Sequence, residues 1–142
     1  MWAIVAVVLA LGLGVSSEAV AQSGQPTLLA MGQWQGADSF HQAQGTALLV
    51  RLPDGRRFVR FEDFRVTNGP DLYVYLSGHP SPRTSAQLHE GGAFEVAQLK
   101  GNIGNQNYEL PAGLDVSSFK SVTIYCKRFS VLFGSAQLIA RP

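Results

Sequence analysis

The groups in this chain that could do redox or metal chemistry are one cysteine, Cys126, and three histidines, His41, His79 and His89. A single cysteine cannot form an internal disulfide. It is therefore a buried inert thiol, half of an intermolecular disulfide, a reactive thiol or a ligand. No second cysteine makes a Cys-x-x-Cys pair, and neither His nor Met follows Cys126, as a blue-copper site would require. The histidines are too far apart to form a ligand pair at i, i+2 or i, i+4.

Other familiar chemistries lack their motifs. The chain has no G-x-S-x-G nucleophile elbow, no phosphate-binding loop and no dinucleotide-binding fingerprint. Its formal net charge is +1, without a basic field that would favour a nucleic-acid partner. Hydrolysis and nucleic-acid binding are therefore disfavoured.

The pattern around Cys126 predicts a strand with one apolar face. Residues two apart point the same way in a strand, so one face carries Val122, Ile124 and Cys126, and the other carries Thr123, Tyr125 and Lys127. We expect Cys126 to point inward near the strand's end. Burial would make it a small hydrophobe, whereas a position at the sheet margin beside Lys127 and Arg128 would favour a reactive thiolate.

The elements that must position these residues are strands. Short apolar segments alternate with turn signals, which predicts an all-β, single-domain antiparallel β-sandwich or barrel-like sandwich over residues 33–142. The segment 53–55 contains the Asp-Gly pair of a tight hairpin, 78–92 is predicted as a long surface loop, and 115–119 as one helical turn capped by Asp115. Residues 22–32 are expected to be a flexible lead-in. The predicted strands cover 46–52, 56–61, 72–77, 94–99, 108–110, 122–133 and 136–140.

The first 21 residues have the features of a signal peptide. An apolar run to Val15 precedes Ala19-Val20-Ala21, the small-residue pattern at which signal peptidase cleaves. The run is short for a membrane span, although an uncleaved N-terminal anchor is the alternative. We therefore expect export to a periplasmic or extracellular location, with no stable membrane span after cleavage.

Three blocks of the sequence resemble the DM13 domain family. They are Asn68-Gly69-Pro70-Asp71 with the following strand to Ser77, the segment 99–111, and the segment 121–134 around Cys126. Gly36, Phe40, His41 and Gly45 are similar to its N-terminal part. The resemblance covers residues 33–140.

The resemblance implies an extracytoplasmic β-rich module of an electron-transfer system. It implies that Cys126 is the family's cysteine, acting as a free thiol or as the ligand of a prosthetic group such as haem. Copper is the other candidate cofactor, and His41 is a candidate second ligand near Cys126. A separate redox partner protein would then be needed. Asn68, Gly69, Pro70 and Asp71 are expected to form a structural turn.

Three functions stay open from the sequence. The first is a redox or electron-transfer module that uses Cys126, with His41 or Tyr125 nearby. The second is a non-catalytic module that binds a protein or glycan, in which Cys126 only packs. The third is a small-ligand carrier with a pocket between its sheets.

Overall fold

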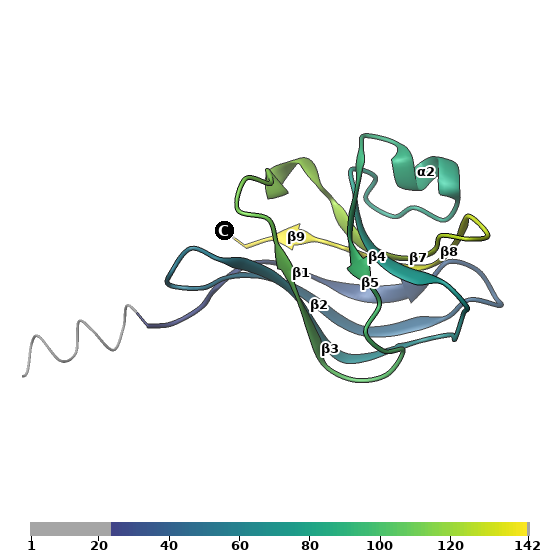
Figure 1. Cartoon of the computed structure of the whole chain (residues 1–142), viewed down its shortest axis with the longest axis horizontal. Coiled ribbons are helices and arrows are strands. Elements are labelled where there is room, and N and C mark those ends of the chain that lie inside the picture. Colours follow the sequence, from purple (N-terminus) through teal and green to yellow (C-terminus); the bar gives the residue numbers. More distant parts are fainter. Residues whose placement is uncertain (1–23, 142) are drawn as a thin grey trace, which may run out of the picture.

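The computed structural model describes residues 24–141, and the predicted signal peptide lies outside them. The described chain is built almost entirely of strands (Figure 1). They are β1 (Thr27–Gly36), β2 (Ala43–Arg51), β3 (Arg57–Val66), β4 (Leu72–Ser77), β5 (Ala93–Gln98), β6 (Gln106–Leu110), β7 (Ser121–Cys126), β8 (Val131–Gln137) and β9 (Ile139–Ala140). A short helix, α2 (Ser85–His89), and a 3₁₀ turn (Val116–Ser118) complete them.

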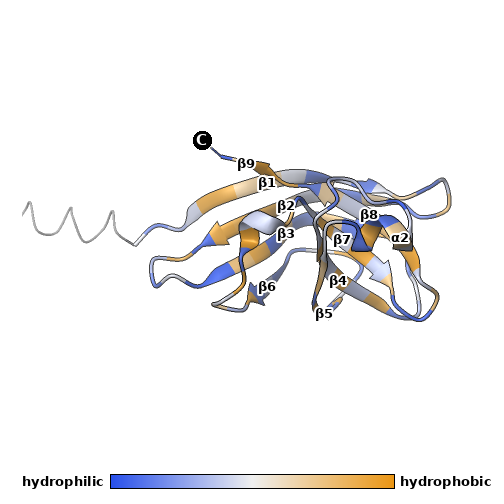
Figure 2. Cartoon of the chain, turned by 90° about the horizontal axis from the view of Figure 1, so that it is seen from above, coloured by the Kyte–Doolittle hydropathy of each residue, from blue (hydrophilic) through white to orange (hydrophobic). Residues whose placement is uncertain are grey.

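The strands form one antiparallel sheet with the order β5-β4-β7-β8-β1-β2-β3-β6, and β9 adds to β1. The sheet curls until its two end strands, β5 and β6, approach each other without pairing, so the domain is a nearly closed barrel (Figures 1 and 2). The all-β, antiparallel, barrel-like prediction is confirmed. β5 and β6 remain the two edge strands of the sheet, because only full closure would pair them with each other.

Local sequence explains the connections that were predicted. Gly55 takes a φ of +93° in the turn between β2 and β3, a conformation that glycine adopts at little cost. β4 has the predicted bounds, Leu72–Ser77. The Asp115 side chain accepts a hydrogen bond from the Ser117 N–H and caps the 3₁₀ turn as expected.

Two expectations about irregular segments are corrected. The lead-in predicted for residues 22–32 is wrong from Thr27 onward, because β1 begins there and pairs with β2, β8 and β9. The loop predicted for 78–92 contains α2, whose first turn is capped by the Thr84 hydroxyl. A helix of five residues is too short to show periodicity in a sequence.

The core lies inside the barrel, where alternate residues of every long strand meet. Trp34, Phe61 and Phe64 pack edge to face at its centre. A smaller cluster on the outer face of β4, β7 and β8 is covered by Leu88 of α2. This second layer explains why all six residues of β7 are buried, where alternation alone would expose three. Among residues 24–141, no helix has the length and apolar character to cross a membrane.

Candidate functional site

Cys126 is the last residue of β7, and its side chain points into the barrel core. It lies opposite Leu72 of β4 on one side and Val131 of β8 on the other. Only 1% of its surface is exposed. The predicted inward direction and terminal position are therefore confirmed, and the thiol is covered in the folded state.

The turn that follows Cys126 is exposed. Lys127, Arg128, Phe129 and Ser130 all lie at the surface, and Phe129 is 61% exposed. Ser130 has a φ of +54°, in the left-handed region that non-glycine residues seldom adopt. The thiol is thus one residue from a short turn that carries an unfavourable backbone conformation.

The charge of Lys127 is directed away from the thiol. Its ammonium group lies 2.7 Å from a carboxylate oxygen of Glu95 and 4.8 Å from the ring centroid of Tyr73. The hydrogen bond with Glu95 raises the pKa of Lys127. The pKa of Glu95 is lowered, first by the hydrogen bond from Lys127 and then by the one from Tyr75. Lys127 is therefore engaged on the outer face of the sheet.

His41 lies at the end of the barrel where β1 meets β2. Its Nδ1 is 2.8 Å from one carboxylate oxygen of Asp38 and 2.9 Å from the other. Its ring lies against Phe133, with 4.4 Å between the centroids. Within residues 24–141, no hydrogen bond joins His41 to Cys126. His41 therefore lies at the barrel end near β8. Its contact residue Phe133 is two residues beyond Val131, the β8 residue that pairs with Cys126.

The Asn68-Gly69-Pro70-Asp71 segment connects β3 to β4 at this same end. Gly69 lies so close to Phe133 that an added Cβ would be 2.8 Å from two ring carbons. The main-chain carbonyl of Asp71 accepts a hydrogen bond from the Lys127 N–H at 3.0 Å. The motif thus holds the start of β4 against the end of β7, beside Cys126.

Haem or copper does not fit the arrangement around Cys126. The Cys126 side chain is buried in the core cluster and only 1% exposed, whereas a haem ligand must face an open slot wide enough for the macrocycle. No group of three or more His, Cys, Asp or Glu residues in the described part of the chain could hold a metal ion.

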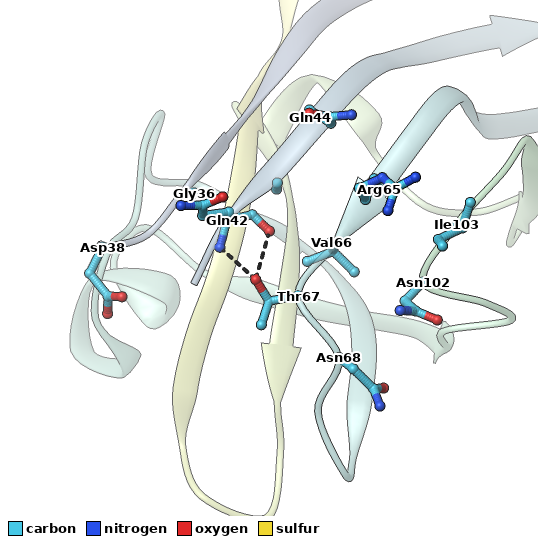
Figure 3. A pocket seen from close by; sticks show the side chains of 11 residues that line it. Gly36, Asp38, Gln42, Gln44, Arg65, Val66, Thr67, Asn68, Asn102 and Ile103 are labelled. Atoms are coloured by element: carbon cyan, nitrogen blue, oxygen red, sulfur yellow. Dashed lines mark hydrogen bonds between the residues drawn. The ribbon is translucent and has the colours of Figure 1, made fainter. Parts of the chain in front are cut away.

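A polar cleft next to the motif was not predicted from the sequence. It lies between the β1–β2 connection, the end of β3 and the loop before β6, and it includes Arg65, Asn68 and Asn102 (Figure 3). The only sequence signal was the number of amide side chains near strand ends. Because these residues come from separate segments, only strand pairing brings them together.

The fold and the site define a small antiparallel β-barrel domain with one buried thiol at the end of a central strand. The model of the family described as Electron transfer DM13 matches residues 36–138, and the chain belongs to this family. Comparison with curated proteins and with solved structures finds no match. The family's description supports an electron-transfer module at a coarse level.

Proposed function

We propose that this protein is an exported electron-transfer module whose redox-active group is the thiol of Cys126. The observation that carries the proposal is the position of Cys126, a buried lone thiol at the last residue of β7, directly before an exposed turn. Membership in an electron-transfer family supports a redox role for the protein. The poor fit to haem or copper favours the thiol itself.

The chemistry open to a lone thiol is exchange with a disulfide on a partner protein. The Cys126 thiolate attacks one sulfur of that disulfide, the partner's S–S bond breaks, and a mixed disulfide forms. The second partner sulfur leaves as a thiolate and takes up the proton released by the Cys126 thiol. The partner disulfide is the oxidant, and a partner thiol reverses the step.

Access to the thiol requires movement of the turn 127–130. Opening it would separate the end of β7 from the start of β8 while the rest of the barrel stays paired. Such local opening costs less free energy than global unfolding. The left-handed Ser130 makes this turn a favourable place for it, because its backbone conformation is released on opening.

The test is the rate at which Cys126 reacts with a small aromatic disulfide such as dithionitrobenzoate in the folded protein. We expect labelling faster than the rate of global unfolding, measured by tryptophan fluorescence under the same conditions. Labelling that occurs only at the unfolding rate would overturn the proposal. Cys126→Ser is expected to lose the reaction and to keep the fold, at a cost of about 1–2 kcal/mol.

A matched control moves the thiol to the middle of the sheet. In Cys126→Ser/Ala136→Cys the only cysteine lies at a fully buried position of β8, away from the turn. Its labelling should follow global unfolding. Equal reactivity of the two thiols, at equal stability, would show that the end of β7 has no special access.

Export is part of the proposal and has its own measurement. The apolar run followed by Ala19-Val20-Ala21 supports removal of residues 1–21. N-terminal sequencing of the protein purified from its native host should give Gln22 as the first residue. A protein that retains residues 1–21 in the membrane fraction would instead support an uncleaved anchor.

A further inference from the structure

The polar cleft beside the motif has a volume of about 540 Å³. Three segments of the chain enclose it: residues 36–44, residues 65–68, and residues 102–103 (Figure 3). A cavity of this size holds a ligand of several hundred daltons. The cleft does not include Cys126, so it is distinct from the proposed redox site.

Amide side chains dominate the cleft. Gln42, Gln44, Asn68 and Asn102 line it together with the guanidinium of Arg65. In the portion of the chain described here, none of these five side chains makes a hydrogen bond. Each amide can both donate and accept a hydrogen bond, so the cleft offers donors and acceptors that the described part of the chain leaves unused.

The charges of the cleft are few and balanced. Arg65 takes part in no ion pair among residues 24–141. The carboxylate of Asp38, which also lines the cleft, accepts hydrogen bonds from the N–H groups of Phe40 and His41 and pairs with the His41 ring. These hydrogen bonds lower the pKa of Asp38 and keep it ionised, and the bond with the His41 ring has the largest effect. One cation and one engaged anion do not suit a polyanion such as a nucleic acid.

One wall of the cleft is apolar, and a smaller hollow lies next to the cleft. Ile103, which is 59% exposed, forms one wall. A second polar hollow of about 170 Å³ meets the cleft at Asn68 and Asn102, and it extends along the Gly69-Pro70 segment. Together they form a surface for an extended ligand rather than a single small ion.

We propose that this cleft binds an oligosaccharide. Paired hydroxyl groups of a sugar match amide side chains, which donate to one oxygen and accept from the next. The C–H face of a sugar ring matches an exposed apolar side chain such as Ile103. The neighbouring hollow would take a second sugar unit, with Asn68 and Asn102 between the two. The proposal is independent of Cys126 chemistry.

Calorimetric titration with defined oligosaccharides tests the proposal. The probes are tetrasaccharides of glucose in α and β linkage, of N-acetylglucosamine and of galacturonate. We expect saturable binding of at least one probe, and a loss of affinity of about tenfold in Arg65→Ala and in Asn102→Ala, the effect of removing one hydrogen-bonding group. Arg51→Ala and Gln35→Ala, exposed residues outside the cleft, should bind like the parent protein.

Several outcomes would overturn the proposal. The first is that no probe binds at about 10 mM. The second is binding whose affinity the cleft variants leave unchanged. The third is tighter binding of an unstructured peptide that is titrated in parallel. Should a variant fail to fold, nitrogen NMR spectra of the parent protein serve instead, and the side-chain amides of Asn68 and Asn102 must shift on titration. Cys126→Ser should keep full sugar affinity, so failure of either proposal is seen separately.

Discussion

The imidazole ring of His41 lies against the phenyl ring of Phe133, with 4.4 Å between their centroids. Gly69 lies against the same phenyl ring. Residues far apart in the sequence thus meet at one aromatic side chain at the end of the barrel. Phe133 lies two residues beyond Val131, the β8 partner of Cys126, so these contacts pack against β8 near the thiol.

Replacing Gly69 with Ala should destabilise the domain by about 1–3 kcal/mol, because the new methyl group would overlap the Phe133 ring at 2.8 Å. The measurement is urea unfolding followed by fluorescence. Gly113→Ala is the control, since a Cβ there meets nothing within 4 Å. Phe133→Leu replaces the ring by a smaller side chain, so Gly69→Ala should destabilise the domain less in the Phe133→Leu background than in the parent protein. A Gly69→Ala protein as stable as Gly113→Ala would contradict the contact.

Asp38 should make the domain more sensitive to acid. Two hydrogen bonds hold the pKa of Asp38 below the ordinary value of 3.8. The bond with the His41 ring has the larger effect, and the bond from the Phe40 N–H comes next. A carboxyl with a depressed pKa in the folded state stabilises the protein above its unfolded pKa. That contribution is lost as the pH falls through the folded pKa.

The melting temperature of Asp38→Asn should therefore fall less steeply than that of the parent protein below about pH 4. Scans from pH 7 to pH 2 measure this difference. Asp71→Asn, which removes an acidic group not engaged with His41, serves as the comparison. Parallel curves for the parent and Asp38→Asn would refute the role of the Asp38–His41 pair.

Strands with strict alternation could be predicted from the sequence. Leu72, Val74 and Leu76 face the core and Tyr75 faces the second cluster, so β4 was correctly bounded. β1 was missed because Gly32 interrupts its apolar pattern. In the structure this glycine is required, since a Cβ would lie 1.9 Å from the main-chain oxygen of Gln137. A residue that normally indicates a break permits the close approach of two strands.

The candidate site was predictable only in part. Periodicity gave the direction and position of Cys126, because both are local properties of one strand. It could not place His41 against Phe133 or gather the cleft around Arg65 and Asn102, because those contacts depend on strand pairing over long sequence separations. The burial of Tyr125 could not be predicted either, because α2 covers the outer face of β7 and that contact depends on the tertiary structure.

Tyr75 should contribute to loss of stability in alkali. It is buried, and its hydroxyl donates to Glu95 at 2.9 Å. Burial first, and then the hydrogen bond to Glu95, raises its pKa well above the ordinary value of 10. Its raised folded pKa gives stability that is complete below the unfolded pKa and lost as the pH rises above it.

The loss attributable to Tyr75 should be at most about 1.4 kcal/mol per pH unit above pH 10. Urea unfolding between pH 8 and pH 11 measures it, and Tyr75→Phe should flatten the curve. Tyr73→Phe, on the same face of β4 but only half-buried, is the matched control. A Tyr75→Phe curve as steep as that of the control would contradict the assignment.

Arg57 should be hard to replace, even by lysine. Its guanidinium donates to the main-chain carbonyls of Pro111, Ala112 and Leu114 at 2.8, 3.0 and 2.7 Å, and so fixes the loop after β6. Lysine keeps the charge but lacks the planar fork that reaches three acceptors. Because the site is half-buried, we expect Arg57→Lys to lose about 1 kcal/mol in urea unfolding. Arg51→Lys, at an exposed position outside such a network, should change stability by less than about 0.5 kcal/mol. Equal losses in the two variants would show that the three carbonyl contacts contribute nothing specific.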